Sequence, residues 1–187
     1  MRKLLVSAVI STLVALPNVG FSAMVDGAQT VFQWTGKKIT SSHTGKLKLK
    51  EDECKIVLDK NNQVAENTVL VMDMNSVNVE DIQGEMNGKF LAHVKNEDFL
   101  EVEKFPTSKL VVKKVEKDSL VVDLTVKGIT NQETVKFTKN GDKYEGVLVF
   151  DRTKYNIKYG SKNFFKSIGD KAILDDVEIK FSLSVKI

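Results

Sequence analysis

The sequence predicts a mainly β protein built as a single antiparallel barrel of about eight strands with one short helical segment. Three observations support this fold class. Apolar residues fall on every second position in most segments after residue 23, which is the spacing of strands with one buried face. Short polar stretches such as "DKNNQ" and "EKDS" separate these segments, as turns do in antiparallel barrels and sandwiches. One segment, within residues 81–104, has helical spacing instead.

The first 22 residues have the layout of a secretory signal peptide. A basic start, "MRK", is followed by an apolar run over residues 4–16 and by small residues near the end of the segment. The apolar run is too short to anchor the chain in a bilayer. We expect cleavage after Ser22 or Ala23, one domain over residues 23–187, and a periplasmic or secreted protein.

Charge and cysteine content narrow the function classes. Without Arg2 and Lys3, the 28 basic residues become 26 against 25 acidic ones, so the processed chain has a net charge of +1. We find no basic stripe with interleaved aromatic residues, and therefore expect no nucleic-acid partner. Cys54 is the only cysteine, so the chain has no internal disulfide, and we expect a buried thiol.

The strands are expected, in chain order, within "AQTVFQWTGKK", "HTGKLKLKE", "CKIVLD", "NTVLVMDMNSV", "SKLVVKKV", "SLVVDLTVKGIT", the two halves of "ETVKFTKNGDKYEGVLVFD", and "DDVEIKFSLSVKI". We take the first of these as the first strand. Asn140-Gly141 predicts a hairpin turn, because both residues tolerate a positive φ. In the last strand the apolar residues alternate with polar ones from Val177 to Ile187, and we expect this apolar face to point into the barrel.

The helical segment begins in "DIQGEMNGKFLAHVK", residues 81–95. Met86, Phe90, Leu91 and Val94 recur at the spacing of one helix face. Gly84 and Gly88 weaken the pattern, so the helix is expected to be short or irregular. The following "NEDFLEVEKFP" predicts a turn that returns the chain to the sheet.

Alternation alone does not say what the apolar faces contact. An outer-membrane barrel alternates too, with its apolar face outward. Aromatic residues make up only 7% of the chain, which leaves few for membrane girdles, and "KLVVKKV" would place charge on both faces. Eight strands close into a barrel that is either filled by side chains or able to hold one slim ligand. The alternation therefore does not decide between a filled interior and one that holds a ligand.

Five segments carry a resemblance to a known family: "FQWTGKKITSSHTGKLKLKE", "GKFLAHVKNEDFLEVEKFPTSKL", "VDLTVKGITNQETVKF", "VLVFDRTKYNIKYG" and "DDVEIKFSLSVK". In order and spacing they resemble the YceI-like family of exported polyisoprenoid-binding proteins. The resemblance implies a lipocalin-like barrel with a helix across it, which holds a polyisoprenoid or another long apolar molecule. It implies no cofactor other than this bound lipid. Leu100 and Leu110 stand where aromatic residues are common in the family, so the preferred ligand remains open.

Several residues are candidates for the ligand-binding interior, with plain core packing as the alternative for each. They are Trp34, Phe90, Phe99, Phe105, Leu124, Phe150 and Phe181. Arg152 is the only arginine after the signal peptide. Its planar fork of donors suits a fixed partner, which we expect to be an acidic side chain at the barrel end, or alternatively a ligand head group. His43 is expected to have a structural hydrogen bond, with head-group contact as the alternative.

Phe164 and Phe165 are adjacent, so they cannot both point inward from a regular strand. They predict a loop at a barrel end that either caps the interior or forms a homodimer contact. No catalytic or phosphate-binding motif is present, and two histidines and one cysteine far apart do not predict a metal site. The leading hypothesis is a non-catalytic carrier of a long-chain lipid. Its rivals are a lipid-modifying enzyme on the same barrel and a packed barrel that acts through protein contacts.

Overall fold

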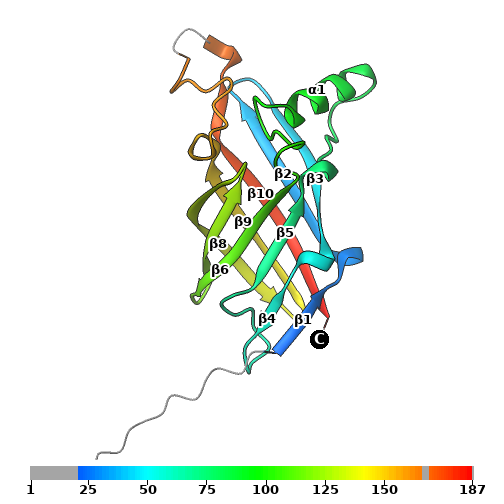
Figure 1. The fold of residues 1–187 in the computed structure, drawn as a ribbon, viewed down its shortest axis with the longest axis vertical. Coiled ribbons are helices and arrows are strands. Elements are labelled where there is room, and N and C mark those ends of the chain that lie inside the picture. Colours follow the sequence, from blue (N-terminus) through cyan, green and yellow to red (C-terminus); the bar gives the residue numbers. More distant parts are fainter. Residues whose placement is uncertain (1–20, 166–168, 187) are drawn as a thin grey trace, which may run out of the picture.

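The computed structural model describes residues 21–165 and 169–186, and these form a closed antiparallel barrel (Figure 1). Eight strands make the ring, in the spatial order β2-β3-β5-β6-β7-β8-β9-β10, and pairing of β10 with β2 closes it. Their bounds are β2 Val31–Lys38, β3 Ser42–Leu49, β5 Val69–Asp73, β6 Thr107–Val115, β7 Ser119–Val126, β8 Ile129–Asn140, β9 Lys143–Asp151 and β10 Ile173–Lys186. The predicted fold class is confirmed.

Two further strands, β1 (Phe21–Val25) and β4 (Ile56–Leu58), pair with each other at the end of the barrel opposite the helix (Figure 1). β1 also pairs with β10, and the buried residues of both strands join the main core. Sequence reasoning placed the first strand at residues 28–38 and so missed β1, whose five residues straddle the expected cleavage point. Cleavage after Ser22 would leave Ala23 to Val25 of this strand, including its two buried residues.

The helix α1 (Glu85–Lys95) lies at the other end of the barrel (Figure 1). It is shorter than the expected segment of residues 81–104. The helix starts after Gly84, whose φ of 63° is not helical, and it ends before Asn96, whose backbone is extended. Five 3₁₀ turns complete the described elements: Gly27–Gln29, Glu51–Glu53, Met74–Ser76, Arg152–Tyr155 and Gly169–Lys171. No helix in the described ranges has both the length and the apolar character needed to cross a membrane.

The strand β10 keeps the predicted alternation. Ile179 and Phe181 face the barrel interior, while Glu178 and Lys180 form an ion pair on the opposite face, with 3.4 Å between Oε1 and Nζ. Ile187 lies outside the described residues. The hairpin at Asn140-Gly141 is present, and Gly141 has the expected positive φ, at 60°.

Packing is uneven along the barrel axis. Next to β1 and β4 the interior is densely packed, and Ile56 and Leu58 have essentially no exposed surface. Phe150, Ile179 and Phe181 also point inward, yet they are only partly buried. Close-packed cores leave such side chains without accessible surface, so this part of the barrel is not filled by the protein itself.

Candidate functional site

The barrel interior contains a cavity of about 380 Å³, which lies within the size range of small-molecule sites, roughly 300–1,000 Å³. Its walls are almost entirely apolar and come from the barrel strands, from α1 and from the loop after β9. Exposed residues near the ends of β2 and β10, such as Lys38 and Leu174, belong to the same walls. The cavity therefore reaches the surface at the end where α1 lies, which we call the mouth.

The structure brings most of the sequence candidates together on these walls. Eight of the eleven lie there: Trp34, His43, Phe90, Phe99, Leu124, Phe150, Arg152 and Phe181. They come from strands on both sides of the barrel and from the helical segment, so residues far apart in the sequence share one enclosed surface. Phe105, Phe164 and Phe165 are not among the described residues that line this cavity.

Phe105 packs outside the cavity, against the turn between β7 and β8. A side chain at Gly128 would come within 2.7 Å of the Phe105 ring, and the ring is covered by Lys104, whose Nζ lies 5.1 Å from its centroid. In the turns after α1, Glu101 adopts a positive φ of 49°, and its backbone oxygen accepts a hydrogen bond from the Phe105 N–H at 2.9 Å. The Phe105 ring thus packs against the turn between β7 and β8 instead of lining the cavity.

Phe164 and Phe165 lie in a loop at a barrel end, as expected, and each is about half exposed to solvent. Their backbone N–H groups donate to the Ser161 carbonyl oxygen, at 3.2 Å and 2.9 Å. This tight turn holds the two rings at the outer edge of the mouth. The apolar cap that the sequence suggested as one alternative is therefore not part of the cavity wall.

An aromatic stack forms one side of the mouth. The rings of Trp34 on β2 and Phe90 on α1 lie nearly parallel, with centroids 6.3 Å apart. Trp34 donates its Nε1–H to the backbone oxygen of Asn78 at 2.9 Å. Its neighbour across the β2–β3 pair is Gly45, where a Cβ atom would come within 2.6 Å of that Nε1. Glycine at this position makes room for the indole.

A second aromatic group spans the mouth. Tyr159, in the loop after β9, lies edge-on to His93 of α1 at 4.6 Å between ring centroids. Phe99 contacts the same tyrosine ring at 5.4 Å. All three residues also line the cavity. They join the helical segment to the loop across the mouth.

His43 is the polar group on the cavity wall next to the aromatic stack. Its ring lies 5.0 Å from that of Phe90, and its Nδ1 lies 2.8 Å from Oδ2 of Asp81. Burial acts to raise the pKa of Asp81, but hydrogen bonds from the Thr44 N–H and from His43 outweigh it, so the pKa of this carboxyl is lowered. A carboxylate on Nδ1 fixes the ring and leaves Nε2 as the nitrogen available to a ligand.

We expect Asp81→Asn to lower the free energy of unfolding by about 1 kcal/mol at neutral pH, because the substitution replaces charge-assisted hydrogen bonds with neutral ones. The contribution of a carboxyl with a lowered pKa is complete above its unfolded pKa, about 3.9, and is lost as the pH falls through its lower folded-state pKa. Urea unfolding at neutral pH and at about pH 3 should thus show the difference shrinking in acid. Asp52→Asn, in the exposed 3₁₀ turn Glu51–Glu53, is the control, and a difference independent of pH would contradict the assignment.

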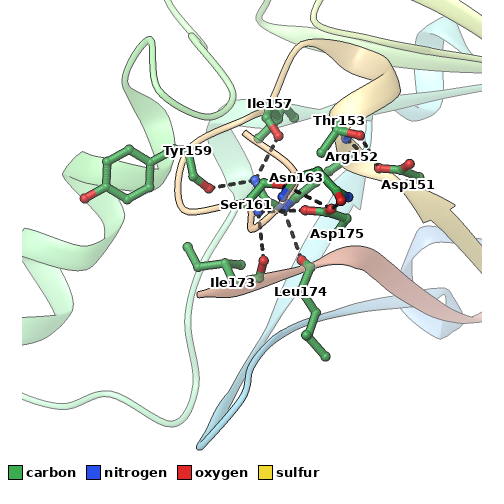
Figure 2. A network of polar contacts seen from close by, with 10 residues as sticks. All are labelled: Asp151, Arg152, Thr153, Ile157, Tyr159, Ser161, Asn163, Ile173, Leu174 and Asp175. Atoms are coloured by element: carbon green, nitrogen blue, oxygen red, sulfur yellow. Dashed lines mark hydrogen bonds and ion pairs between the residues drawn. The ribbon is translucent and has the colours of Figure 1, made fainter. Parts of the chain in front are cut away.

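Arg152 is 2% exposed and binds the loop after β9 to the start of β10 (Figure 2). A guanidinium has five N–H donors, and each of the five in Arg152 donates to an acceptor within the protein. The acceptors are the backbone oxygens of Ile157, Tyr159, Ile173 and Leu174, and Oδ1 of Asp175 at 3.3 Å. Burial lowers the pKa of Arg152, and Asp175 acts in the opposite direction. No donor of this arginine is left for a ligand head group.

Asp175 adds further hydrogen bonds to this network of Arg152 and its acceptors, which we call the Arg152 clamp. Its Oδ2 accepts hydrogen bonds from Ser161 Oγ at 3.0 Å and from Asn163 Nδ2 at 2.7 Å (Figure 2). The same carboxylate therefore pairs with Arg152 and holds the loop that carries Tyr159. The acidic partner expected from the sequence is present, and it fixes the shape of the mouth.

Sequence reasoning missed several wall residues. Leu47 and Phe137 lie on the inner faces of β3 and β8, and the period-2 pattern of their segments could have identified them. Tyr159 lies in an irregular loop, where no periodicity points to it. Ile173 and Leu174 are adjacent, yet both line the cavity, because the pairing of β10 with β2 shifts register between Ile173 and Val177.

The polar chemistry of the site is sparse. Within residues 21–165 and 169–186, no group of three or more histidine, cysteine or acidic side chains is arranged to hold a metal ion. Cys54 is half-buried next to the backbone of Val71, and burial raises the pKa of its thiol. The arrangement is thus suited to enclosing apolar surface, with a hydrogen-bonding nitrogen of His43 at its edge.

A closed eight-stranded barrel with an apolar interior cavity belongs to the class of β-barrels with an enclosed ligand site. A family model described as "YceI-like domain" matches residues 24–185. The chain belongs to the YceI-like family.

The chain is also similar to curated proteins and to solved structures. A UPF0312 protein of Staphylococcus aureus (strain USA300) is 33% identical over 105 residues, and the match covers 50% of this chain and 58% of that protein. The chain thus spans little more than half the length of the curated relatives it matches. The crystal structure of Burkholderia cenocepacia BcnA has a TM-score of 0.61 at 20% identity and covers 87% of this chain and 99% of its own. A structure described as a polyisoprenoid binding domain from Saccharophagus degradans has a TM-score of 0.60 at 14% identity, covering 88% and 97%. At these identities the two structures show a shared fold.

Proposed function

We propose that this protein is an exported carrier that holds one long apolar molecule in the barrel cavity, without catalysis. The ligand class is a polyisoprenoid, an isoprenoid quinone or a fatty-acid derivative. Export is supported by the signal-peptide layout of the first 22 residues. The ligand class is supported by membership of the YceI-like family and by the described binding activity of the Saccharophagus degradans domain.

The observation that carries the proposal is the hollow, apolar interior. Phe150, Ile179 and Phe181 point into the barrel and keep accessible surface that a packed core would remove. Burial of a methylene contributes about 0.8 kcal/mol, so ten methylenes would supply roughly 8 kcal/mol before ordering costs. Few polar groups line the cavity, so most of the binding free energy would come from the hydrocarbon rather than from a head group.

The test is to purify the protein from the compartment in which it is made, extract it with organic solvent, and analyse the extract by mass spectrometry. The expected result is a stoichiometric isoprenoid or long-chain lipid. A protein that is empty on purification and that also fails to bind isoprenoid quinones and fatty amides in solution would rule out the proposal.

The His43–Asp81 pair favours a second candidate, an enzyme that modifies such a lipid. A histidine whose Nδ1 is held by a carboxylate, and which lines a cavity, has the arrangement of a general base. This candidate predicts that His43→Gln leaves binding intact but stops a change in the mass or stereochemistry of the bound molecule. A ligand that is unchanged after prolonged incubation with the unsubstituted protein would eliminate it.

A further inference from the structure

Exposed apolar side chains gather around the mouth of the cavity. Five of them are between 43% and 49% exposed: Ile39, Tyr159, Phe164, Phe165 and Leu174. We call these five residues the mouth patch. Backbone hydrogen bonds hold the segments that carry them together, from the Ile39 N–H to the Ala172 oxygen at 3.4 Å and from the Ile173 N–H to the Gly160 oxygen at 2.8 Å. Exposed apolar side chains that cluster in this way mark an interaction site.

Five lysines lie in the segments that carry this patch or next to them in the chain. They are Lys37 and Lys38 at the end of β2, Lys158 and Lys162 in the loop after β9, and Lys171 before β10. Among the described residues none of these five has an ion-pair partner, and Lys158 Nζ lies 4.9 Å from the centroid of the Phe164 ring. Asp170 is the acidic side chain in the hollow that contains Lys38 and Lys171. The rim of the mouth on this side is therefore basic as well as apolar.

We propose that the mouth patch docks the protein on the surface of an anionic lipid bilayer, so that the cavity opens toward the acyl chains. This inference rests on the proposed function, since it names the place from which the ligand is loaded or to which it is released. Aromatic and aliphatic side chains would enter the interface between head groups and acyl chains. The lysines would keep their apolar stems along it and their ammonium groups at the anionic lipids.

The charges favour a bilayer over a second copy of the chain. A symmetric dimer contact places the same patch of both copies face to face, and would bring the unpaired lysines of one copy against those of the other. Like charges brought together in this way oppose association. An anionic lipid surface, by contrast, supplies the opposite charge for each of them.

The patch is continuous with the cavity. Tyr159 and Leu174 belong to both, since each is exposed at the mouth and also lines the interior. A hydrocarbon chain leaving the bilayer at this point would pass from one apolar surface to the next. This avoids full exposure of the chain to water, which would cost about 0.8 kcal/mol for each methylene.

Vesicle flotation tests this docking with the processed protein and two vesicle compositions, phosphatidylcholine mixed with phosphatidylglycerol, and phosphatidylcholine alone. Binding is expected to the anionic vesicles and to weaken with added salt, as screening requires. The double variant Phe164→Ser/Phe165→Ser should lower the partition coefficient roughly tenfold or more. Met24→Ser is the matched control, because Met24 is 71% exposed on β1, at the opposite end of the barrel.

A charge variant provides an independent measurement. Lys162→Glu/Lys171→Glu should also reduce binding to anionic vesicles by roughly tenfold or more, whereas Lys117→Glu, in the exposed turn between β6 and β7, should not. The proposal is overturned if the unsubstituted protein does not float with anionic vesicles, or if the controls lose binding as much as the patch variants. It is equally overturned if sedimentation equilibrium shows a dimer that the Phe164→Ser/Phe165→Ser substitutions dissociate.

Binding of a fluorescent polyene fatty acid without vesicles separates this inference from the proposed function. The docking proposal expects the patch variants to bind the probe like the unsubstituted protein, because Phe164 and Phe165 lie outside the cavity wall. Loss of probe binding in those variants would overturn docking and make the patch part of the ligand site. An unsubstituted protein that binds vesicles but neither carries lipid nor binds the probe would contradict the carrier function and leave the docking surface standing.

Discussion

Replacing Arg152 with leucine should lower the free energy of unfolding by about 3–5 kcal/mol, the cost of removing one partner from a buried ion pair. The substitution leaves Asp175 without its cation and leaves four backbone oxygens without their donors. Buried acceptors that lose their hydrogen bonds pay the full penalty of desolvation. We therefore expect one of the largest single-residue effects in the protein.

Arg152→Lys should recover only part of the loss. Lysine restores the positive charge, but a single ammonium cannot reach acceptors that a planar guanidinium contacts from several sides. Lys154→Leu is the matched control, since Lys154 lies two residues away in the same 3₁₀ turn and is exposed. Its effect should stay within about 0.5 kcal/mol. Urea unfolding of the three variants measures these differences, and an Arg152→Leu protein as stable as the Lys154→Leu protein would contradict the clamp.

Filling the cavity with Leu110→Trp should weaken binding of an isoprenoid quinone roughly fiftyfold. Leu110 on β6 is only partly buried and lines the cavity, so a larger side chain there would extend into the open space. The tryptophan side chain would displace about three methylenes of the ligand. At about 0.8 kcal/mol each, they account for the expected loss of affinity. Competition with a fluorescent polyene fatty acid measures the change in affinity.

Val111→Trp is the control for this experiment. Val111 is the next residue on β6, and its side chain points to the opposite face of the sheet. It should change the affinity by less than about twofold, since the residue does not touch the ligand. Thermal unfolding of both variants checks that they are folded. Equal binding by the Leu110→Trp protein and the unsubstituted protein would mean that the ligand occupies some other site.

The barrel fold could be predicted because the alternation of apolar and polar residues is repeated from strand to strand. The alternation of Ile179 and Phe181 with Glu178 and Lys180 fixes one apolar face on β10, and other strands carry the same pattern. The β1 strand gave a weaker signal, since five residues leave little room for periodicity. Whether the interior is filled or hollow does not follow from alternation, because both interiors need the same pattern and differ only in the summed volume of the side chains.

The site was predictable in part. Large apolar residues on strands and on α1, such as Trp34 and Phe90, reach the cavity because element periodicity sets their direction. Phe105 looks the same in sequence, yet its ring packs against Gly128, outside the cavity. The loop residue Tyr159 follows no repeat. Its position depends on the hydrogen bonds of Arg152, whose acceptors are mostly backbone atoms and therefore leave no mark in the amino-acid sequence.

The same clamp has a consequence for how the protein can diversify. Four acceptors of the Arg152 guanidinium are main-chain oxygens, at positions 157, 159, 173 and 174, and every amino acid supplies such an oxygen. The side chains at these four positions all line the cavity. Evolution or an engineer can thus exchange them to fit a cargo of another shape while the scaffold that presents them stays intact.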